Sequence, residues 1–428
     1  MSQPQEEPAY YASECISKKY REILKSNGIN EEIEEVTVAD AGLKGEGMAS
    51  QTQYVTIKLK NTNMKPLNLF VKVHTSNPQH SEWIEEWKLF EKESRFFMEY
   101  VPAAKEFCKS KGREGLIDFY PKCYYGDQTM VVLENLVLEK GYVLLNKEVK
   151  QDLEATRLAI VNLAKHHAIS YAFIKELGGA EKFFDRFPNL NFEPFLQESA
   201  RVMMEPMLDN GLSTNITILE KNNVEGKDEA VEKLKSHLGN PFSLMQDVLK
   251  YNPEDERLLV LNHGDYWNNN SLFLKDSAND KAIGHVAIDL QMVNYNSPAT
   301  DISYYLYTSV KEEVRQANLQ ELLKLYFDTL KETAQNLDHT LDLTFGEFYA
   351  IYLKKLKFGF WFGFCVATDA GLAIMKDLDI NEMGELKDYA SQSEKLIQKW
   401  IEENPEKGLE SARKIVGLVN EYYSLIEA

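Results

Sequence analysis

The chain has 428 residues, more than one hydrophobic core usually serves, so its length excludes a small single-core fold and predicts two lobes or domains. Its formal net charge of −19 argues against nucleic acid as the main partner, while a local basic pocket for a phosphate stays open. Its four cysteines are scattered without CxxC spacing, which indicates free thiols in a reducing compartment rather than a zinc site or a disulfide framework.

The ends of the chain show no signal for export or membrane insertion. The first residues are polar and acidic and contain no apolar signal region. The apolar run at residues 358–368 is too short to span a bilayer. We therefore expect a cytoplasmic protein, and a monomer is compatible with the sequence.

The chain begins with elements that suggest a nucleotide-binding loop. Residues 1–30 are predicted to form a tail and a helix over 14–26, which Gly28 ends because glycine tolerates the left-handed conformation. A glycine-rich loop at 41–50 follows, between predicted strands at 33–38 and 54–60. Glycine lets backbone approach a phosphate closely, so this loop can cover a nucleotide. An ordinary hairpin turn is the alternative, because the loop lacks the lysine and hydroxyl of a Walker A motif.

A strand and a helix then supply a cation and a carboxylate. Residues Leu67–His74 alternate between apolar and polar, which places Lys72 in mid-strand on the face opposite Val71. A helix is predicted from about Ser81, a candidate N-cap, and Glu93 lies at the edge of its apolar stripe. Because an unpaired buried carboxylate is costly, Lys72 is a reasonable partner for Glu93, and a solvated glutamate is the alternative.

The sequence pattern changes after residue 134. A hairpin is predicted from strands at 119–125 and 129–134, and nearly everything beyond it has helical period. We therefore predict an α+β protein with a tail and helix at 1–30, a small β-rich lobe at 31–134 and a large, mainly helical lobe at 135–428. A crevice between the lobes would be the default ligand site.

The second half of the chain is predicted to be helical around one irregular region. His167 lies on the buried face of a helix at 150–173 and is interpreted as a hydrogen-bonded core histidine. Residues 180–225 are expected to form irregular short helices. The aromatic run at 358–364 is interpreted as a buried core helix, with the floor of an apolar pocket as the alternative. Further helices are predicted at 229–249, 299–308, 313–337, 344–367, 385–402 and 409–426.

The stretch Leu-Asn-His-Gly-Asp-Tyr-Trp-Asn-Asn-Asn at 261–270 carries the strongest functional signal. Asp265 and Asn270 are five residues apart, and Asp289 ends a later strand. Phosphoryl transfer needs groups that hold a metal and orient the accepting hydroxyl, and oxygen ligands suit Mg²⁺. We therefore expect Asp265 to take the proton of the hydroxyl, and Asn270 and Asp289 to hold Mg²⁺. Lys72, fixed by Glu93, would contact the phosphates of the nucleotide. Metal-dependent hydrolysis and a buried capping network around His263 and Asp265 are the alternatives.

Three motifs, at 263–270, 288–291 and 297–302, resemble the ecdysteroid kinase-like family. That family, common in insects, belongs with aminoglycoside phosphotransferases and choline kinases in the bilobal protein-kinase-like fold. The resemblance implies ATP and Mg²⁺ as cofactors, Asp265 as the catalytic aspartate, and Asp301 with His263 as support for the catalytic loop. It also implies that backbone groups of Glu134 and Leu136 bind adenine. The phosphate contacts implied for the glycine-rich loop are Gly45, Gly47 and Ser50.

The sequence departs from the family pattern at two places. Leu290 stands where the family commonly has Phe, and Asn268 and Asn269 add amides without evident partners. The acidic residues Glu93, Asp265 and Asp289 are all present, and so is Lys72. The resemblance therefore implies a kinase that phosphorylates a small-molecule alcohol.

The acceptor that we expect is an apolar alcohol. It would be a steroid such as an ecdysteroid, or a hydroxylated xenobiotic that the protein helps to detoxify. The aromatic run at 358–364 favours such an acceptor over choline. A silent binding protein that sequesters a small ligand, and a choline-type kinase, are the alternatives. A protein kinase is disfavoured because no Ala-Pro-Glu pattern follows Asp289.

Overall fold

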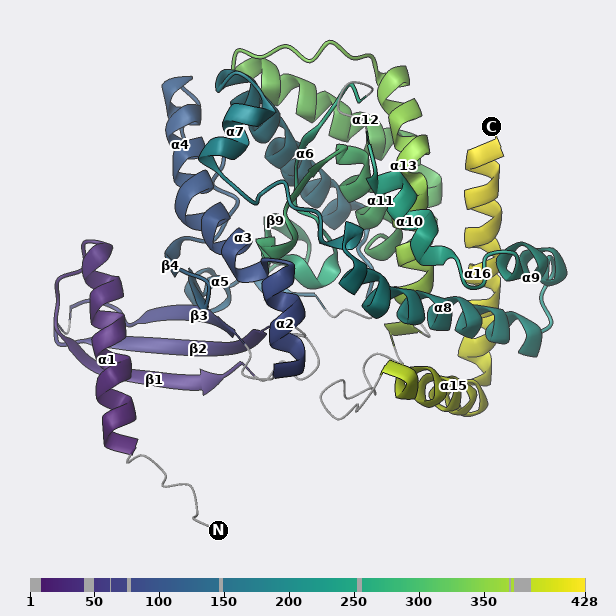
Figure 1. Ribbon diagram of the computed structural model, residues 1–428, viewed down its shortest axis with the longest axis horizontal. Coiled ribbons are helices and arrows are strands. Elements are labelled where there is room, and N and C mark those ends of the chain that lie inside the picture. The colour runs from purple at the N-terminus through teal and green to yellow at the C-terminus, as the bar shows by residue number, and fades with distance from the viewer. Residues whose placement is uncertain are drawn as a thin grey trace. The chain divides into compact units, whose positions relative to one another are not determined.

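The computed structural model describes residues 9–41, 50–61, 63–74, 78–145, 149–251, 256–368, 371–372 and 386–427 (Figure 1). The chain forms two compact units. The first contains Met1–Tyr100 and Pro121–Tyr142, and the second contains Val101–Tyr120 and Val143–Ala428. The predicted lobe boundary after Glu134 falls inside the first unit. The three-part division of the chain therefore stays a prediction.

The first unit is built on a five-stranded antiparallel sheet in the order β1-β2-β3-β5-β4. Helix α1 (Ala9–Ser26) packs on one face, where Tyr20, Ile23 and Leu24 join a core with Leu69 and Val71. The strands are β1 (Ile33–Asp40), β2 (Ser50–Leu59), β3 (Leu67–His74), β4 (Cys123–Gly126) and β5 (Met130–Glu134). The predicted alternation of β3 is confirmed, since its apolar side faces this core.

The helix predicted from Ser81 is wrong in its start and its continuity. Helix α2 (Pro78–Glu86) begins before Ser81, so this serine is not its N-cap. Helix α3 (Leu89–Arg95) begins after Lys88, whose φ of 58° is left-handed, and a π-helical turn (Phe96–Tyr100) follows. The helical spacing of the aromatic residues continues through the break, so periodicity did not reveal it. A short helix, α5 (Leu136–Lys140), completes the first unit.

The second unit is mainly helical and carries two small sheets. One sheet has the order β6-β8-β9, and the other pairs β10 with β7. The α+β class, with a small antiparallel sheet and a larger helical part, is confirmed. No helix in the described part of the chain is long and apolar enough to cross a membrane. The strands are β6 (Val143–Leu144), β7 (Val260–Asn262), β8 (Ser271–Lys275), β9 (Ala282–Ala287) and β10 (Asn294–Asn296). The helices are α4 (Val101–Ser110), α6 (Leu153–Glu176), α7 (Ala180–Arg186), α8 (Glu198–Lys221), α9 (Lys227–Lys235), α10 (Pro241–Leu249), α11 (Pro298–Thr308), α12 (Glu312–Asn336), α13 (Phe345–Val366), α15 (Leu386–Glu403) and α16 (Pro405–Glu427).

Two predictions for residues 180–249 are wrong. The region expected to be irregular contains α8, a continuous helix of 24 residues with Pro206 inside it. Because a proline usually interrupts a helix, the helical spacing of the buried residues Ala200, Met204 and Leu208 was not recognised as one continuous helix. The single helix expected at 229–249 is instead α9 and α10. Left-handed Gly239 and Pro241 at the start of α10 separate them, as glycine and proline do at helix boundaries.

The aromatic run at 358–364 lies in the core, as the favoured interpretation predicts. Phe360 is fully buried and stacks on Tyr422 of α16, with ring centroids 3.9 Å apart. Two glycines in the run explain how α13 approaches α11. A Cβ atom at Gly359 would lie 2.1 Å from the carbonyl carbon of Ser303, and one at Gly363 would lie 2.8 Å from that of Tyr307. The helices can approach this closely only because both positions lack a side chain.

Replacing Gly359 by alanine is expected to destabilise the protein by about 3 kcal/mol, the upper end for overpacking, because the added methyl group meets backbone that cannot rotate away. Gly346→Ala is the matched control on the same helix, since nothing lies within 4 Å of its added Cβ. There the higher helix propensity of alanine should leave stability equal or raise it by up to about 1 kcal/mol. Urea denaturation checks both, and equal effects would contradict the close packing of α11 and α13.

Candidate active site

The loop at residues 263–270 joins β7 to β8 and lies beside the segment that joins β9 to β10. A 3₁₀ turn (Asn268–Asn270) leads into β8, which pairs with β9. The N–H of Ile288 donates to the carbonyl of Asn270 at 3.0 Å. This bond extends the hairpin by one step. It brings Asn270 beside the residue that precedes Asp289, so two predicted metal ligands come from neighbouring backbone.

Gly264 is required by the path of this loop. Its φ of +80° lies in the left-handed region, and a Cβ atom there would lie 2.0 Å from the carbonyl oxygen of Met292. Met292 ends a 3₁₀ turn (Leu290–Met292) that follows Asp289 directly. The loop therefore rests on the backbone of the Asp289 segment, and only glycine fits at the contact.

His263 links the same two segments as a neutral side chain. Its Nε2 lies 3.0 Å from the carbonyl oxygen of Ile288, which can only accept, so Nε2 carries the proton. Its Nδ1 then accepts the backbone N–H of Asp265 at 3.3 Å. Burial lowers the pKa of His263, which keeps the imidazole in this neutral form.

Asp301 holds the backbone of the loop from the other side. Its carboxylate accepts the N–H of His263 at 2.7 Å and that of Gly264 at 3.0 Å. His167 Nε2 lies 3.1 Å from the same carboxylate, and His167 Nδ1 lies 2.7 Å from the hydroxyl of Tyr326. His167 is fully buried, so its interpretation as a hydrogen-bonded core histidine is confirmed.

Both oxygens of the Asp265 carboxylate have a donor. The Tyr304 hydroxyl donates to Oδ1 at 2.8 Å, and the Asn270 amide donates to Oδ2 at 2.8 Å. Burial and the nearby Asp289 charge raise the pKa of Asp265 to about 7, while the bonds from Tyr304 and Asn270 act to lower it. Sequence reasoning missed Tyr304. Its place three residues after Asp301 on one helix was a usable signal, because such positions share a helix face.

Asn270 and Asp289 fit a magnesium ion by their chemistry. The amide nitrogen of Asn270 is used on Asp265, on both its carboxylate and its carbonyl, which leaves the amide oxygen for a ligand. Asp289 has a left-handed φ of 67°, an uncommon conformation that often marks a functional residue. Among the described residues, no group of three or more His, Cys, Asp or Glu could hold a metal. Magnesium needs no such group, since it commonly takes one or two carboxylates together with substrate phosphates and water.

The departures from the family pattern have structural explanations in part. Asn268 accepts from Gln151 Nε2 at 3.0 Å and donates to the carbonyl of Val149 at 3.3 Å, so its amide ties the loop to the segment before α6. Leu290 is fully buried. Nothing in the structure explains Asn269.

The other predicted site residues lie in the first unit. Lys72 on β3 and Glu93 on α3 form a buried ion pair at 2.5 Å, which confirms their predicted pairing. Ser50 begins β2 opposite His74. The N–H of Leu136 lies in the first turn of α5, where backbone N–H groups have no intrahelical acceptor. The N–H of Glu134 donates to the carbonyl oxygen of Lys122. Gly45 and Gly47 lie outside the described residues.

Comparisons with known proteins place the chain among kinase-like phosphotransferases. The sequence model of the ecdysteroid kinase-like family matches residues 44–339, so the chain belongs to this family. Membership supports phosphotransferase activity in general. A search of curated proteins found no match.

Solved structures with similar folds were also found. A choline kinase from Cryptosporidium parvum is 15% identical, with 94% of this chain and 99% of that chain covered and a TM-score of 0.40. A Plasmodium vivax ethanolamine kinase is 12% identical, with 92% and 91% covered and a TM-score of 0.40. A GDP complex of aminoglycoside 2′-phosphotransferase-IIIa is 14% identical, with 90% and 97% covered and a TM-score of 0.36.

Proposed function

We propose that the protein is a small-molecule kinase that transfers the γ-phosphate of ATP, with Mg²⁺, to a hydroxyl of an apolar alcohol such as an ecdysteroid or a hydroxylated xenobiotic. The observation that carries the proposal is the Asp265 carboxylate, held at both oxygens by Tyr304 and Asn270. Family membership supports the reaction type. A phosphoryl group would add charge to an apolar compound, which suits detoxification.

Asp265 would act as the base in this reaction. The substrate oxygen attacks the γ-phosphorus, its proton passes to the Asp265 carboxylate, and ADP leaves. The contacts from Tyr304 and Asn270 would hold the carboxylate in position for this role. Asn270 and Asp289 would hold Mg²⁺, which neutralises phosphate oxygens when bound. Lys72, oriented by Glu93, would contact the phosphates, and backbone groups of Glu134 and Leu136 would meet adenine.

The surroundings of Tyr304 support an apolar acceptor. Its ring packs against Phe362 and Phe358, with centroids 4.9 and 5.9 Å away. Phe195 lies 6.2 Å from Phe358 and 6.3 Å from Phe362. The group that holds Asp265 is therefore backed by aromatic rings, which suit an apolar acceptor, whereas an aminoglycoside would call for acidic groups.

Calorimetry and turnover assays test the proposed function. We expect Mg²⁺-dependent ATP binding, and ATP consumption with hydroxylated steroids or xenobiotics rather than with choline or an aminoglycoside. Lys72→Met should weaken ATP binding by at least about tenfold because it removes the cation meant for the phosphates. Binding of an apolar ligand without any affinity for nucleotide would instead identify a sequestering protein. Turnover only with choline would identify a choline-type kinase.

Tyr304→Phe is expected to lower kcat by about tenfold, because it removes one hydrogen bond to a charged acceptor and keeps the buried ring. The KM for ATP should stay unchanged, since Tyr304 orients Asp265 rather than the nucleotide. Steady-state kinetics with an acceptor from the panel measures both values. Tyr349→Phe, on the partly exposed face of α13, is the control. An unchanged kcat for Tyr304→Phe would contradict its positioning role.

A further inference from the structure

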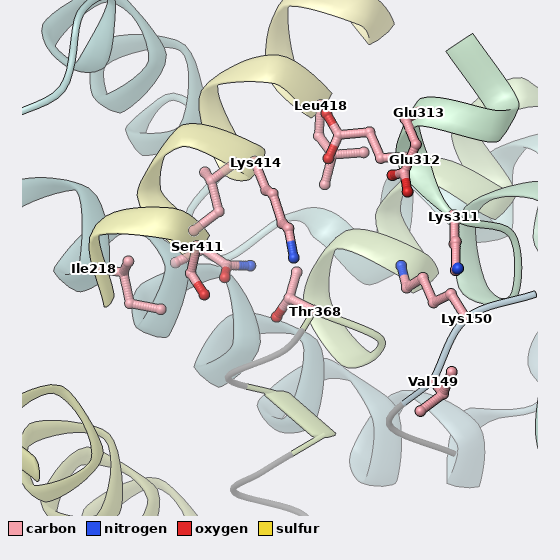
Figure 2. A pocket seen from close by; sticks show the side chains of 12 residues that line it. Val149, Lys150, Ile218, Lys311, Glu312, Glu313, Thr368, Ser411, Lys414 and Leu418 are labelled. Atoms are coloured by element: carbon pink, nitrogen blue, oxygen red, sulfur yellow. The ribbon is translucent and has the colours of Figure 1, made fainter. Parts of the chain in front are cut away.

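Gln151 lies at the inner end of the short segment that precedes α6. It is buried, and its backbone forms a parallel bridge with the stretch between α11 and α12. Its N–H donates to the carbonyl of Ser309 at 2.7 Å, and its carbonyl accepts the N–H of Lys311 at 3.1 Å. Figure 2 shows the outer part of this segment, Val149 and Lys150, beside Lys311 along one pocket. The backbone of Gln151 is therefore held in place on both sides of its side chain.

The side chain of Gln151 joins two parts of the second unit that are distant in sequence. Its Nε2 donates to Oδ1 of Asn268 at 3.0 Å, across a separation of 117 residues. Its Oε1 accepts the hydroxyl of Tyr305, across a separation of 154 residues. Asn268 and Tyr305 are both buried, so the two hydrogen bonds lie in the interior. One amide therefore connects the loop at residues 263–270 to α11.

A backbone carbonyl fixes the direction of these hydrogen bonds. The carbonyl of Val149 can only accept, so Asn268 turns its amide nitrogen toward it, at 3.3 Å. The amide oxygen of Asn268 then faces Gln151, which turns its own nitrogen to that oxygen. The oxygen of Gln151 is left for Tyr305, whose hydroxyl donates to it. Glutamine suits this position because one side chain must donate at one end and accept at the other.

Both partners of this glutamine are next to residues assigned to phosphoryl transfer. Asn268 begins the 3₁₀ turn that ends at Asn270, and the Asn270 amide donates to Oδ2 of Asp265 at 2.8 Å. Tyr305 follows Tyr304 on α11, and the Tyr304 hydroxyl donates to Oδ1 of the same carboxylate at 2.8 Å. A turn of three residues has little slack, so a shift of its first residue moves its last. The glutamine is therefore placed to control the position of Asn270.

We propose that Gln151 is a positioning residue for magnesium binding, which acts by holding Asn268 and through it the proposed metal ligand Asn270. The inference rests on the proposed function, because it takes Asn270 as a ligand of Mg²⁺. Residues that orient a metal ligand without touching the metal change metal affinity by about 10- to 100-fold when they are replaced. The effect of Gln151 therefore belongs to the metal-dependent part of ATP binding.

Calorimetry of ATP binding to the full chain, with Mg²⁺ and separately with EDTA, tests this role. Gln151→Met keeps an unbranched side chain but removes the donor to Asn268. We expect this variant to weaken ATP binding about tenfold with Mg²⁺, because Asn270 is no longer held for the metal. Binding in EDTA should stay unchanged. An equal loss under both conditions would overturn the proposal, since it would show a general disturbance of the fold.

Gln246→Met is the matched control. Gln246 is a buried glutamine of α10 that also uses both ends of its amide, since it accepts from Arg201 at 2.6 Å and donates to the carbonyl of Phe195 at 2.7 Å. These contacts do not reach the loop at residues 263–270. The control should therefore keep the wild-type dependence on Mg²⁺. The same loss of Mg²⁺-dependent affinity in Gln246→Met would overturn the specific role of Gln151.

Asn268→Ala removes the other end of the same hydrogen bond and keeps the test decisive if Gln151→Met does not fold, which thermal unfolding checks. It should cause a similar loss, and the double variant should lose no more than either single variant because both act through one link. Losses that multiply in the double variant overturn the proposal. So does a wild-type dependence on Mg²⁺ that Gln151→Met retains. A wild type whose ATP binding does not depend on Mg²⁺ would overturn the proposed function as well.

Discussion

Asp265→Asn is expected to lower kcat by about 10²- to 10⁴-fold, the usual contribution of a positioned general base. The amide cannot accept the proton of the attacking hydroxyl at neutral pH. It can keep both present contacts, because its oxygen can accept from Asn270 while its nitrogen donates to the hydroxyl oxygen of Tyr304. The protein should therefore stay folded and bind ATP with near wild-type affinity.

The Asp265→Asn measurement needs an acceptor that the wild type phosphorylates. Single-turnover transfer to that acceptor separates the chemical step from binding. Asp185→Asn, at an exposed position of α7, is the control and should transfer at the wild-type rate. Equal transfer by Asp265→Asn would show that this carboxylate is not the base. Absent ATP binding by the wild type would instead count against the proposed function as a whole.

Local patterns were enough to predict much of the first unit. The alternation at Leu67–His74 placed Lys72 on the face away from the core, and the apolar spacing of the next helix placed Glu93 at a buried edge. Because a buried carboxylate needs a partner, their pairing could be predicted from the sequence alone. The start of α13 can also be predicted from the local sequence, because Thr344 and Glu347 form a capping box there.

The arrangement around Asp265 could be predicted only in part. The spacing of the loop motif indicated which side chains matter, but Tyr304 reaches Asp265 through the way α11 packs against the loop. Asn268 finds its partner Gln151 at a separation of 117 residues, which no local pattern encodes. The break between α2 and α3 was missed for the opposite reason, since the local pattern continues while the backbone does not.

Asp301→Ala is expected to destabilise the second unit by about 3–5 kcal/mol, because it leaves several buried donors without an acceptor. The N–H groups of His263 and Gly264 lose the carboxylate that accepts from both of them, and His167 loses the acceptor beside its Nε2. Alanine also leaves a cavity at a position that is 2% exposed. Urea denaturation followed by circular dichroism measures the change in unfolding free energy.

A matched control distinguishes this effect from the general loss of a carboxylate. Asp328 lies on α12 with its side chain 55% exposed and pairs with Lys324, so Asp328→Ala should change stability by less than about 1 kcal/mol. If Asp301→Ala were equally mild, the carboxylate could not be holding the loop. A large loss would instead link the catalytic loop to the helical core, because the same carboxylate that fixes His263 and Gly264 is bound by His167 of α6. The position of Asp265 would then depend on residues that take no part in the chemistry.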